Sequence, residues 1–412
     1  MEELSINGGR PAKRKPYPEW PAFDEREISS VVDVIKSRKW WRMVGEQVTE
    51  FEREFAAYHN ARAAVAVTNG TQAIEVALAA LGVEHGDEVI VPAYSFISTA
   101  TAVLGAGAVP VFVDILPDSY CLDPSKLEAA ITPRTKAIIP VHMAGHVADM
   151  DAIIEVADRH GLPVVEDAAH AHGAEWRGKR VGALHRGGGI FSFQAGKLMT
   201  AGEGGLVMSN DEEFIERCFL YGNCGRPRTD RTYQHTVLGS NCRMSELHAA
   251  VLRAQMDRLD EQIAVREANA RLLDDAMRRV PGVEPQGHDP RVNRHPHYMY
   301  MFRYDEAEFG GLSRMDFVDA LIAEGVPAFV GYPAMYRTPV FINRAFGARW
   351  NPADPLLPDY SQTSCPVAER VGDTVVWFHH RVLLGDEQDV RETADAVEKV
   401  RAHARRAVGA AS

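Results

Sequence analysis

The sequence predicts an α/β protein in which a largely parallel sheet lies between helices and is followed by a smaller α+β domain. Between residues 48 and 207, short apolar runs alternate with helical patterns, an order that is typical of βαβ units. After residue 211 the pattern becomes mainly helical. A charged amphipathic stretch over residues 246–279 is long enough to bridge two domains.

The expected elements of the first domain follow from this alternation. Short apolar runs predict a seven-stranded sheet, with strands at 63–67, 88–91, 109–113, 137–141, 163–166, 190–193 and 206–209. Helical periodicity predicts the segments between them, at 71–81, 98–105 and 150–160.

The second part of the chain is justified in the same way. One helix is expected over 246–279, since its apolar positions recur at helical spacing and Pro281-Gly282 ends it. Further strands are expected at 298–303, 326–330 and 374–378, and further helices at 314–324 and after 386. We expect an N-terminal segment (1–25) that packs on the second domain, a large domain (26–260) and a small C-terminal domain (261–412).

Composition and charge exclude several classes of function. The 45 basic against 57 acidic residues leave a net charge of −12, which argues against nucleic acid and anionic membranes as partners. The acidic N-terminus lacks the apolar core of a secretory signal, and no apolar stretch approaches the ~20 residues of a membrane span, so a cytoplasmic protein is expected. Five scattered cysteines predict neither disulfides nor a metal site.

Three segments carry candidate chemistry. An apolar strand runs directly into a helix at Gly70 and Thr71, where free N–H groups, the helix dipole and a hydroxyl suit a phosphate. Asp167 and His170 lie just beyond a predicted buried strand, where open α/β sheets bind ligands. Taken singly, these two segments are also compatible with an ordinary strand–turn–helix join and with a helix cap, and the lysine of the third segment, Lys197, is compatible with an ordinary surface charge.

Lys197 lies among small residues after an apolar strand, a poor position for a solvated charge. Desolvation can lower the pKa of such a lysine, so that its amine acts as a Schiff-base nucleophile. A phosphate site, the acid Asp167, the Ser192 hydroxyl and Lys197 together match the needs of pyridoxal 5′-phosphate: a phosphate cradle, a partner for the pyridinium nitrogen and a reactive amine.

With this combination the sequence resembles the DegT/DnrJ/StrS family of pyridoxal-phosphate-dependent, fold type I sugar aminotransferases, from about residue 8 to residue 384. The resemblance implies catalytic roles for Lys197, Asp167 and His170. It also implies cofactor contacts: phosphate ligands at Gly70, Thr71 and Ser192, a stacking ring at Phe96, the pyridine-nitrogen partner at Asp167, a neighbour of the phenolic oxygen at His170, and covalent attachment at Lys197.

The same resemblance implies a homodimer with shared active sites, because Asn241 is similar to the residue that reaches the cofactor phosphate of the neighbouring subunit. Lys197 argues against a dehydrating branch of the family, which has histidine at this position. Runs at 40–43, 141–145, 196–205 and 377–384 resemble the branch that contains 3-amino-5-hydroxybenzoate synthase. Ala195 and the segment 303–314 depart from that branch, and the segment looks more like cyclitol and keto-sugar aminotransferases.

We therefore expect amino transfer from L-glutamine or L-glutamate onto a ketone of a cyclic polyol, in aminocyclitol-type antibiotic biosynthesis. An aromatising synthase that acts on an aminodehydroquinate-like carbocycle is the alternative. A non-catalytic sensor is a third possibility, which the intact Lys197 and Asp167 disfavour. Six residues are candidate substrate contacts, with packing or dimer-interface roles as the alternative for each: Arg42, His142, His172, Tyr298, His379 and Arg381.

Overall fold

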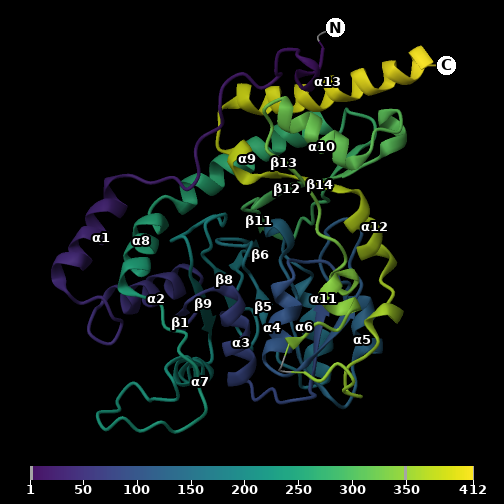
Figure 1. The fold of residues 1–412 in the computed structure, drawn as a ribbon. Helices are drawn as coiled ribbons and strands as arrows, with labels where there is room; N and C mark the ends of the chain where they lie inside the picture. Colours follow the sequence, from purple (N-terminus) through teal and green to yellow (C-terminus); the bar gives the residue numbers. More distant parts are fainter. Residues whose placement is uncertain (1–2, 348–349, 412) are drawn as a thin grey trace.

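The computed structural model describes residues 3–347 and 350–411. Figure 1 shows the large sheet and its helices in the lower part of the view, with a smaller sheet above them and α13 (Glu387–Ala411) running across the top. Each part has its own hydrophobic core. The protein is therefore built as a large α/β unit that carries a smaller α+β unit.

The large sheet consists of a four-stranded and a three-stranded part. The first has the order β1 (Ala63–Val67), β9 (Gly205–Ser209), β8 (Gly189–Ser192), β5 (Glu166–Asp167), and the second β3 (Val109–Val113), β2 (Glu88–Pro92), β4 (Thr135–Ile138). Parallel bridges from Ile138 to Val164 and from Val141 to Asp167 join the two parts. Because β9 is antiparallel to both of its neighbours and the other pairs are parallel, the expected seven-stranded, mostly parallel sheet is confirmed.

Helices pack against this sheet and connect its strands. They are α2 (Gln47–Tyr58), α3 (Gly70–Ala80), α4 (Ser98–Gly105), α5 (Leu127–Ala130), α6 (Met150–Arg159) and α7 (Glu212–Gly222), with α1 (Glu25–Ser37) against α8 (Glu246–Met256). Side-chain caps begin several of them, as where the Asp149 carboxylate accepts a hydrogen bond from the Ala152 N–H. A small antiparallel ribbon of β6 (Glu175–Trp176), β7 (Lys179–Arg180) and β11 (Val292–Arg294) lies beside the sheet.

The small domain is built on an antiparallel sheet. Its order is β10 (Val283–Pro285), β12 (Met299–Tyr304), β14 (Val375–His379), β13 (Ala328–Val330). Its helices are α9 (Leu259–Met277), α10 (Arg314–Ala323), α12 (Pro366–Thr374) and α13, and the short α11 (Pro339–Ile342) lies in the connection from β13 to α12. Aromatic rings fill the core, where the Tyr304 and Phe317 rings stack at 4.3 Å and Phe302 meets Phe378 at 5.0 Å. Short 3-10 turns complete the chain at Ser5–Asn7, Pro124–Lys126, Met143–Gly145, Glu306–Phe309, Met335–Arg337, Tyr360–Gln362 and His380–Leu383.

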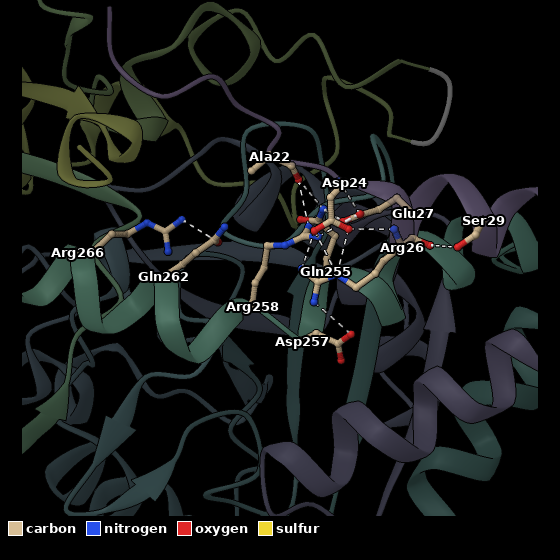
Figure 2. A network of polar contacts seen from close by, with 10 residues as sticks. All are labelled: Ala22, Asp24, Arg26, Glu27, Ser29, Gln255, Asp257, Arg258, Gln262 and Arg266. Atoms are coloured by element: carbon tan, nitrogen blue, oxygen red, sulfur yellow. Dashed lines mark hydrogen bonds and ion pairs between the residues drawn. The ribbon is translucent and has the colours of Figure 1, made fainter. Parts of the chain in front are cut away.

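The single helix expected over 246–279 is wrong. The chain forms two helices, since α8 ends at Met256 and α9 begins at Leu259. At the break, the Arg258 guanidinium bonds to the Ala22 carbonyl and to the carboxylates of Asp24 and Glu27 (Figure 2). The apolar pattern continues across the break, so periodicity did not reveal it. Two strands were also placed too broadly, at 137–141 and 163–166, because part of each run pairs only through the isolated bridges.

The N-terminal segment, residues 3–24, crosses from the small domain to the large one. The Lys13 ammonium is buried and lies 2.7 Å from the Asp389 carboxylate of α13, and the Tyr17 hydroxyl bonds to Thr393 on the same helix. Further along, the Trp20 indole donates a hydrogen bond to the Ala195 carbonyl in the large domain. The segment therefore connects the small domain with the chain just before Lys197.

Candidate active site

A cavity of about 1070 Å³ lies at the carboxyl ends of the parallel strands. β1, β2, β5 and β8 run in the same direction, so the loops that follow them meet at one edge of the sheet. The small domain contributes Tyr298 and Tyr332 to the wall. Eight of the residues named from the sequence line this cavity: Gly70, Thr71, Phe96, Asp167, His170, Ser192, Lys197 and Tyr298.

The start of α3 forms one end of the cavity. Asn69 caps the helix by accepting a hydrogen bond from the Gln72 N–H at 2.8 Å, and the earlier N–H groups have no partner within the helix. A Cβ at Gly70 would lie 2.8 Å from the Ser192 Cβ, so glycine is what lets Ser192 approach the helix start. The Thr71 hydroxyl lies beside this point and bonds to Ser98. These donors and the helix dipole suit a phosphate dianion.

Asp167 lies at the end of β5 on the floor of the cavity. One carboxylate oxygen accepts a hydrogen bond from the Thr99 hydroxyl at 2.8 Å, and the other accepts from the Ala169 N–H at 3.2 Å. Burial raises the pKa of the carboxyl above its ordinary value, while these bonds oppose the shift. A cationic group beside Asp167 would stabilise its charged form, which fits a protonated pyridine nitrogen.

Lys197 follows β8 and faces the same space. Its side chain is buried, and desolvation lowers the pKa of the amine to about 8, against which the Asp167 charge acts. The ammonium nitrogen lies 4.3 Å from the centre of the Tyr298 ring. A lysine with this pKa has about a tenth of its amine unprotonated at pH 7, far more than an ordinary lysine, and the free amine is the form that carbonyl condensation and proton transfer require.

His170 and Phe96 complete the walls. The His170 ring stacks on Tyr298 at 4.3 Å, and its Nδ1 is buried with no hydrogen-bond partner among the residues that the structure describes. Burial lowers the pKa of His170 well below its usual value, so the ring is neutral. Phe96 is half exposed at the cavity, leaving a ring face for a planar ligand. An orphaned nitrogen and a free ring face, together with the phosphate cradle, fit pyridoxal 5′-phosphate.

Three other candidate residues, Arg42, His142 and His172, are not part of the cavity wall. The Arg42 guanidinium is buried and lies 2.9 Å from the Glu52 carboxylate. The His142 ring lies 3.1 Å from Glu166, next to Asp167 in the chain. The His172 Nε2 bonds to the Ser192 carbonyl at 3.0 Å. Because Arg42, His142 and His172 do not line the cavity, their roles as substrate contacts stay predictions.

His379, Arg381 and Asn241 also lie outside the cavity wall. The His379 Nδ1 accepts a hydrogen bond from the Arg381 N–H, which begins the short turn after β14. Asn241 is exposed and pairs with Asn223 through an isolated backbone bridge. The structure of one chain therefore leaves Asn241 available at the surface.

Sequence reasoning missed Thr99, Tyr332, Arg243 and His248, which all line the cavity. Thr99 lies in the segment that follows β2. Nothing in its neighbouring residues indicated that its hydroxyl bonds to Asp167, 68 positions later in the chain. Tyr332 comes from the small domain, and no motif surrounds it. Arg243 and His248 lie close to Asn241 in the sequence, and that proximity was the available signal.

A phosphate cradle, a buried acid and a buried lysine at one edge of a mostly parallel sheet define a pyridoxal-phosphate enzyme of fold type I. The profile of the DegT/DnrJ/EryC1/StrS aminotransferase family matches residues 21–398. The chain belongs to this family and is a pyridoxal-phosphate-dependent aminotransferase.

Relatives cover nearly the full length of the chain. It is 48% identical to 3-amino-5-hydroxybenzoate synthase from Amycolatopsis mediterranei, over 94% of this chain and 98% of that protein. It is 37% identical to L-glutamine:2-deoxy-scyllo-inosose aminotransferase from Streptoalloteichus tenebrarius, over 97% and 98%. A crystal structure of 3-amino-5-hydroxybenzoic acid synthase superposes with a TM-score of 0.86 at 47% identity, over 94% of this chain and 99% of that chain.

Within the described residues, no helix has both the length and the apolar character needed to cross a membrane.

Proposed function

We propose that this aminotransferase moves an amino group from L-glutamine or L-glutamate onto a ketone of a cyclic polyol, in aminocyclitol-type antibiotic biosynthesis. One observation carries the catalytic part of the proposal: a buried lysine, with its pKa lowered to about 8, shares a cavity with the buried carboxyl of Asp167. Relatives named as L-glutamine:2-deoxy-scyllo-inosose aminotransferases support the substrate class.

The residues divide the work as follows. When bound, pyridoxal 5′-phosphate supplies an electron sink for the carbon next to the transferred nitrogen. Asp167, oriented by Thr99, would hold a proton on the ring nitrogen. The Lys197 amine would anchor the cofactor and act as the base and acid that takes a proton from, and returns it to, the carbon next to the transferred nitrogen.

The cavity wall contains several hydroxyl and amide side chains. Thr68, Gln72, Ser95, Ser98 and Gln194 line it, together with the ionisable side chains of Glu75, Glu203 and Arg243. Hydroxyl and amide groups both donate and accept hydrogen bonds, so they complement the ring hydroxyls of a cyclic polyol. This composition supports a keto-cyclitol or keto-sugar as the amino acceptor.

A second candidate activity has its own support. The 48% identity to 3-amino-5-hydroxybenzoate synthase exceeds that to the cyclitol aminotransferases named above. Such an enzyme would dehydrate and aromatise an aminodehydroquinate-like carbocycle. The Arg243 guanidinium on the cavity wall could bind the carboxylate of that substrate.

We also propose a homodimer in which Asn241 of one chain completes the phosphate site of the other. Asn241 is exposed and outside its own cavity. Burying exposed apolar side chains against a second copy of the chain would be favourable. Five such side chains are Trp40, Trp41, Tyr233, Val237 and Leu238.

The substrate proposal is tested with glutamine labelled with ¹⁵N at the α-amino group. The purified enzyme is incubated in parallel with scyllo-inosose, a keto-sugar nucleotide and an aminodehydroquinate, and products are identified by mass spectrometry. Labelled aminocyclitol or amino-sugar supports the proposal. An aromatic product from the third substrate alone would replace it with the synthase activity.

The catalytic assignment is tested with Lys197→Ala, which we expect to abolish label transfer and the visible absorbance of the lysine-bound cofactor. Lys36→Ala is the matched control, because Lys36 is exposed on α1, and it should behave as wild type. An unchanged absorbance in Lys197→Ala would contradict the assignment.

A further inference from the structure

Two rings from distant parts of the chain contact the backbone of the turn that carries Lys197. The Trp20 indole N–H, from the N-terminal segment, donates to the Ala195 carbonyl at 3.1 Å. The His380 Nε2, from the small domain, lies 3.2 Å from the Gly196 carbonyl. The two rings also contact each other edge to face, with centroids 4.5 Å apart. The backbone immediately before Lys197 is thus held at two successive carbonyls.

Next to these rings lies an arginine that has no acidic partner within residues 3–347 and 350–411. Arg266, on α9, is fully buried, and its Nε and Nη1 have no hydrogen-bond partner among the described residues. In Figure 2 its one bond to the residues drawn runs to Gln262, whereas Arg258, eight positions earlier, meets the carboxylates of Asp24 and Glu27. Burial lowers the pKa of Arg266 to about 9, which still leaves it charged at neutral pH.

The contact between Arg266 and His380 determines which nitrogen of the histidine carries the proton. The Arg266 Nη2 lies 3.4 Å from the His380 Nδ1, and a guanidinium can only donate. The Nδ1 must therefore accept, and burial together with the Arg266 charge lowers the pKa of His380 well below its usual value. A neutral ring whose Nδ1 accepts has its hydrogen on Nε2, where it can be donated to the Gly196 carbonyl.

We propose that Arg266 is a positioning residue for Lys197: its guanidinium holds His380 in the Nε2–H form, and His380 together with Trp20 fixes the turn from which Lys197 enters the cavity. The Arg266 guanidinium carbon lies 5.5 Å from the centre of the Trp20 ring, so it supports both rings. This proposal rests on the role proposed above for Lys197.

The energetic cost of Arg266 supports a functional role. A buried charge without an ion-pair partner is costly, and replacing buried charges with apolar groups of similar volume is often neutral or stabilising. If Arg266 served only to stabilise the fold, Arg266→Met would lower the melting temperature. We expect the opposite combination, with a melting temperature that is unchanged or higher and a slower enzyme.

The first experiment determines which ring nitrogen of His380 is protonated in cofactor-free protein. Long-range ¹H–¹⁵N spectra of ¹⁵N-histidine-labelled protein report which ring nitrogen is protonated, and His380→Gln identifies the His380 signals. We expect the Nε2–H form in wild type and in Arg266→Lys, and loss of this single form in Arg266→Met. The Nε2–H form persisting unchanged in Arg266→Met would overturn the proposal.

The second experiment compares matched pairs of variants. His380→Gln keeps an N–H donor near the Nε2 position, whereas His380→Leu removes it. We expect His380→Leu and Arg266→Met to lower kcat about tenfold or more through misplacement of Lys197, with a smaller change in the KM for the amino donor. His380→Gln and Arg266→Lys should recover most of the rate. Equal losses in His380→Gln and His380→Leu would contradict the proposed hydrogen bond.

Arg258→Met is the control for loss of a buried arginine, since Arg258 lies directly before the first residue of α9. It breaks the ion pairs with Asp24 and Glu27, so it should lower the melting temperature and leave the His380 signals unchanged. A change in the His380 signals of this control would also count against the proposal. Different results would contradict the two proposals. Activity in Lys197→Ala would contradict the catalytic role of Lys197. The positioning role of Arg266 is tested by the protonation state of His380, which is measured without cofactor or substrate.

Discussion

Lys197 and Asp167 influence each other across the space that the cofactor is expected to fill. Desolvation lowers the pKa of Lys197 and raises that of Asp167, and each charge partly reverses the shift of the other. A bound cofactor with a protonated ring nitrogen would favour the ionised Asp167. The cofactor-free enzyme is therefore suited to present a lysine that readily loses its proton.

The pH dependence of Lys197 should show this balance. In cofactor-free enzyme, its labelling by an amine-selective reagent should rise with pH to a midpoint near 8, because only the neutral amine reacts. Since the Asp167 charge raises the pKa of Lys197, Asp167→Asn should move the midpoint to lower pH. Peptide mass spectrometry after labelling measures both.

Lys15 provides an internal reference in the same digest. It is exposed, and its pKa is raised by its hydrogen bond to Asp386, so it should be labelled at higher pH than Lys197 in every sample. A midpoint for Lys197 equal to that of Lys15 would contradict the described environment of the active-site lysine.

Among the elements, α3 shows how a local sequence signal becomes a binding site. Asn69 caps the helix, Gly70 begins it, and the missing side chain at Gly70 lets Ser192 at the end of β8 approach. The proposed phosphate site therefore lies where a helix start meets a strand end from a remote part of the chain.

Gly70→Ala should weaken cofactor binding and stability together. Its Cβ would lie 2.8 Å from the Ser192 Cβ, and forcing such an overlap typically costs about 1–3 kcal/mol of folding free energy. We expect a weaker Kd for pyridoxal 5′-phosphate, measured by fluorescence titration, and a lower urea midpoint.

Gly222→Ala is the matched control for this substitution. A Cβ there would lie 3.7 Å from the Cys242 Cβ, which is ordinary contact, at the last residue of α7. Its Kd for the cofactor should equal that of wild type, and equal weakening in both variants would argue against the steric explanation.

The N-terminal segment is a second element whose role depends on buried charge. Lys13→Met should lower the free energy of unfolding by about 3–5 kcal/mol, because it removes the nearest cation of the buried Asp389 carboxylate and leaves only the exposed Lys15 ammonium, 3.9 Å away. Urea denaturation measures the change. Lys15→Met removes the exposed ion pair with Asp386 and the longer contact to Asp389, so it should change the urea midpoint much less than Lys13→Met does.

The assembled protein combines a cofactor cradle in the large domain with walls from the small domain and, as proposed, with Asn241 from a second chain. Tyr298 and Tyr332 reach the cavity from the small domain, and Trp20 reaches the Lys197 turn from the N-terminal segment. The active site therefore depends on how these parts are held together.

Shared active sites can be tested by mixing variants. Lys197→Ala and Asn241→Ala dimers, unfolded together and refolded at limiting cofactor, should form mixed dimers in which one site is intact. Activity of the mixture should exceed that of either variant refolded alone, as measured by label transfer. No gain, with mixed dimers present by native mass spectrometry, would show that Asn241 does not act across the interface.

Local patterns were enough to predict most of the fold and to single out several residues that line the cavity. Apolar runs and helical periodicity indicated the strands and helices of the large domain, and Gly70, Thr71, Asp167 and Lys197 stood out by their places at strand ends and helix starts. The roles of these residues and of Ser192 toward the cofactor came from the family resemblance. These features depend on neighbours within a few residues, because backbone hydrogen bonding and side-chain periodicity are local properties.

Long-range packing determined the rest, because no local pattern records which distant groups come within hydrogen-bond distance. It ended α8 before Arg258, brought Thr99 to Asp167, and placed Tyr298 against both His170 and Lys197. It also buried Arg266, an ordinary surface residue by its sequence context, behind the turn of the active-site lysine. The chemistry of the site follows from residue types that the sequence displays, whereas their protonation and orientation follow from the folded surroundings.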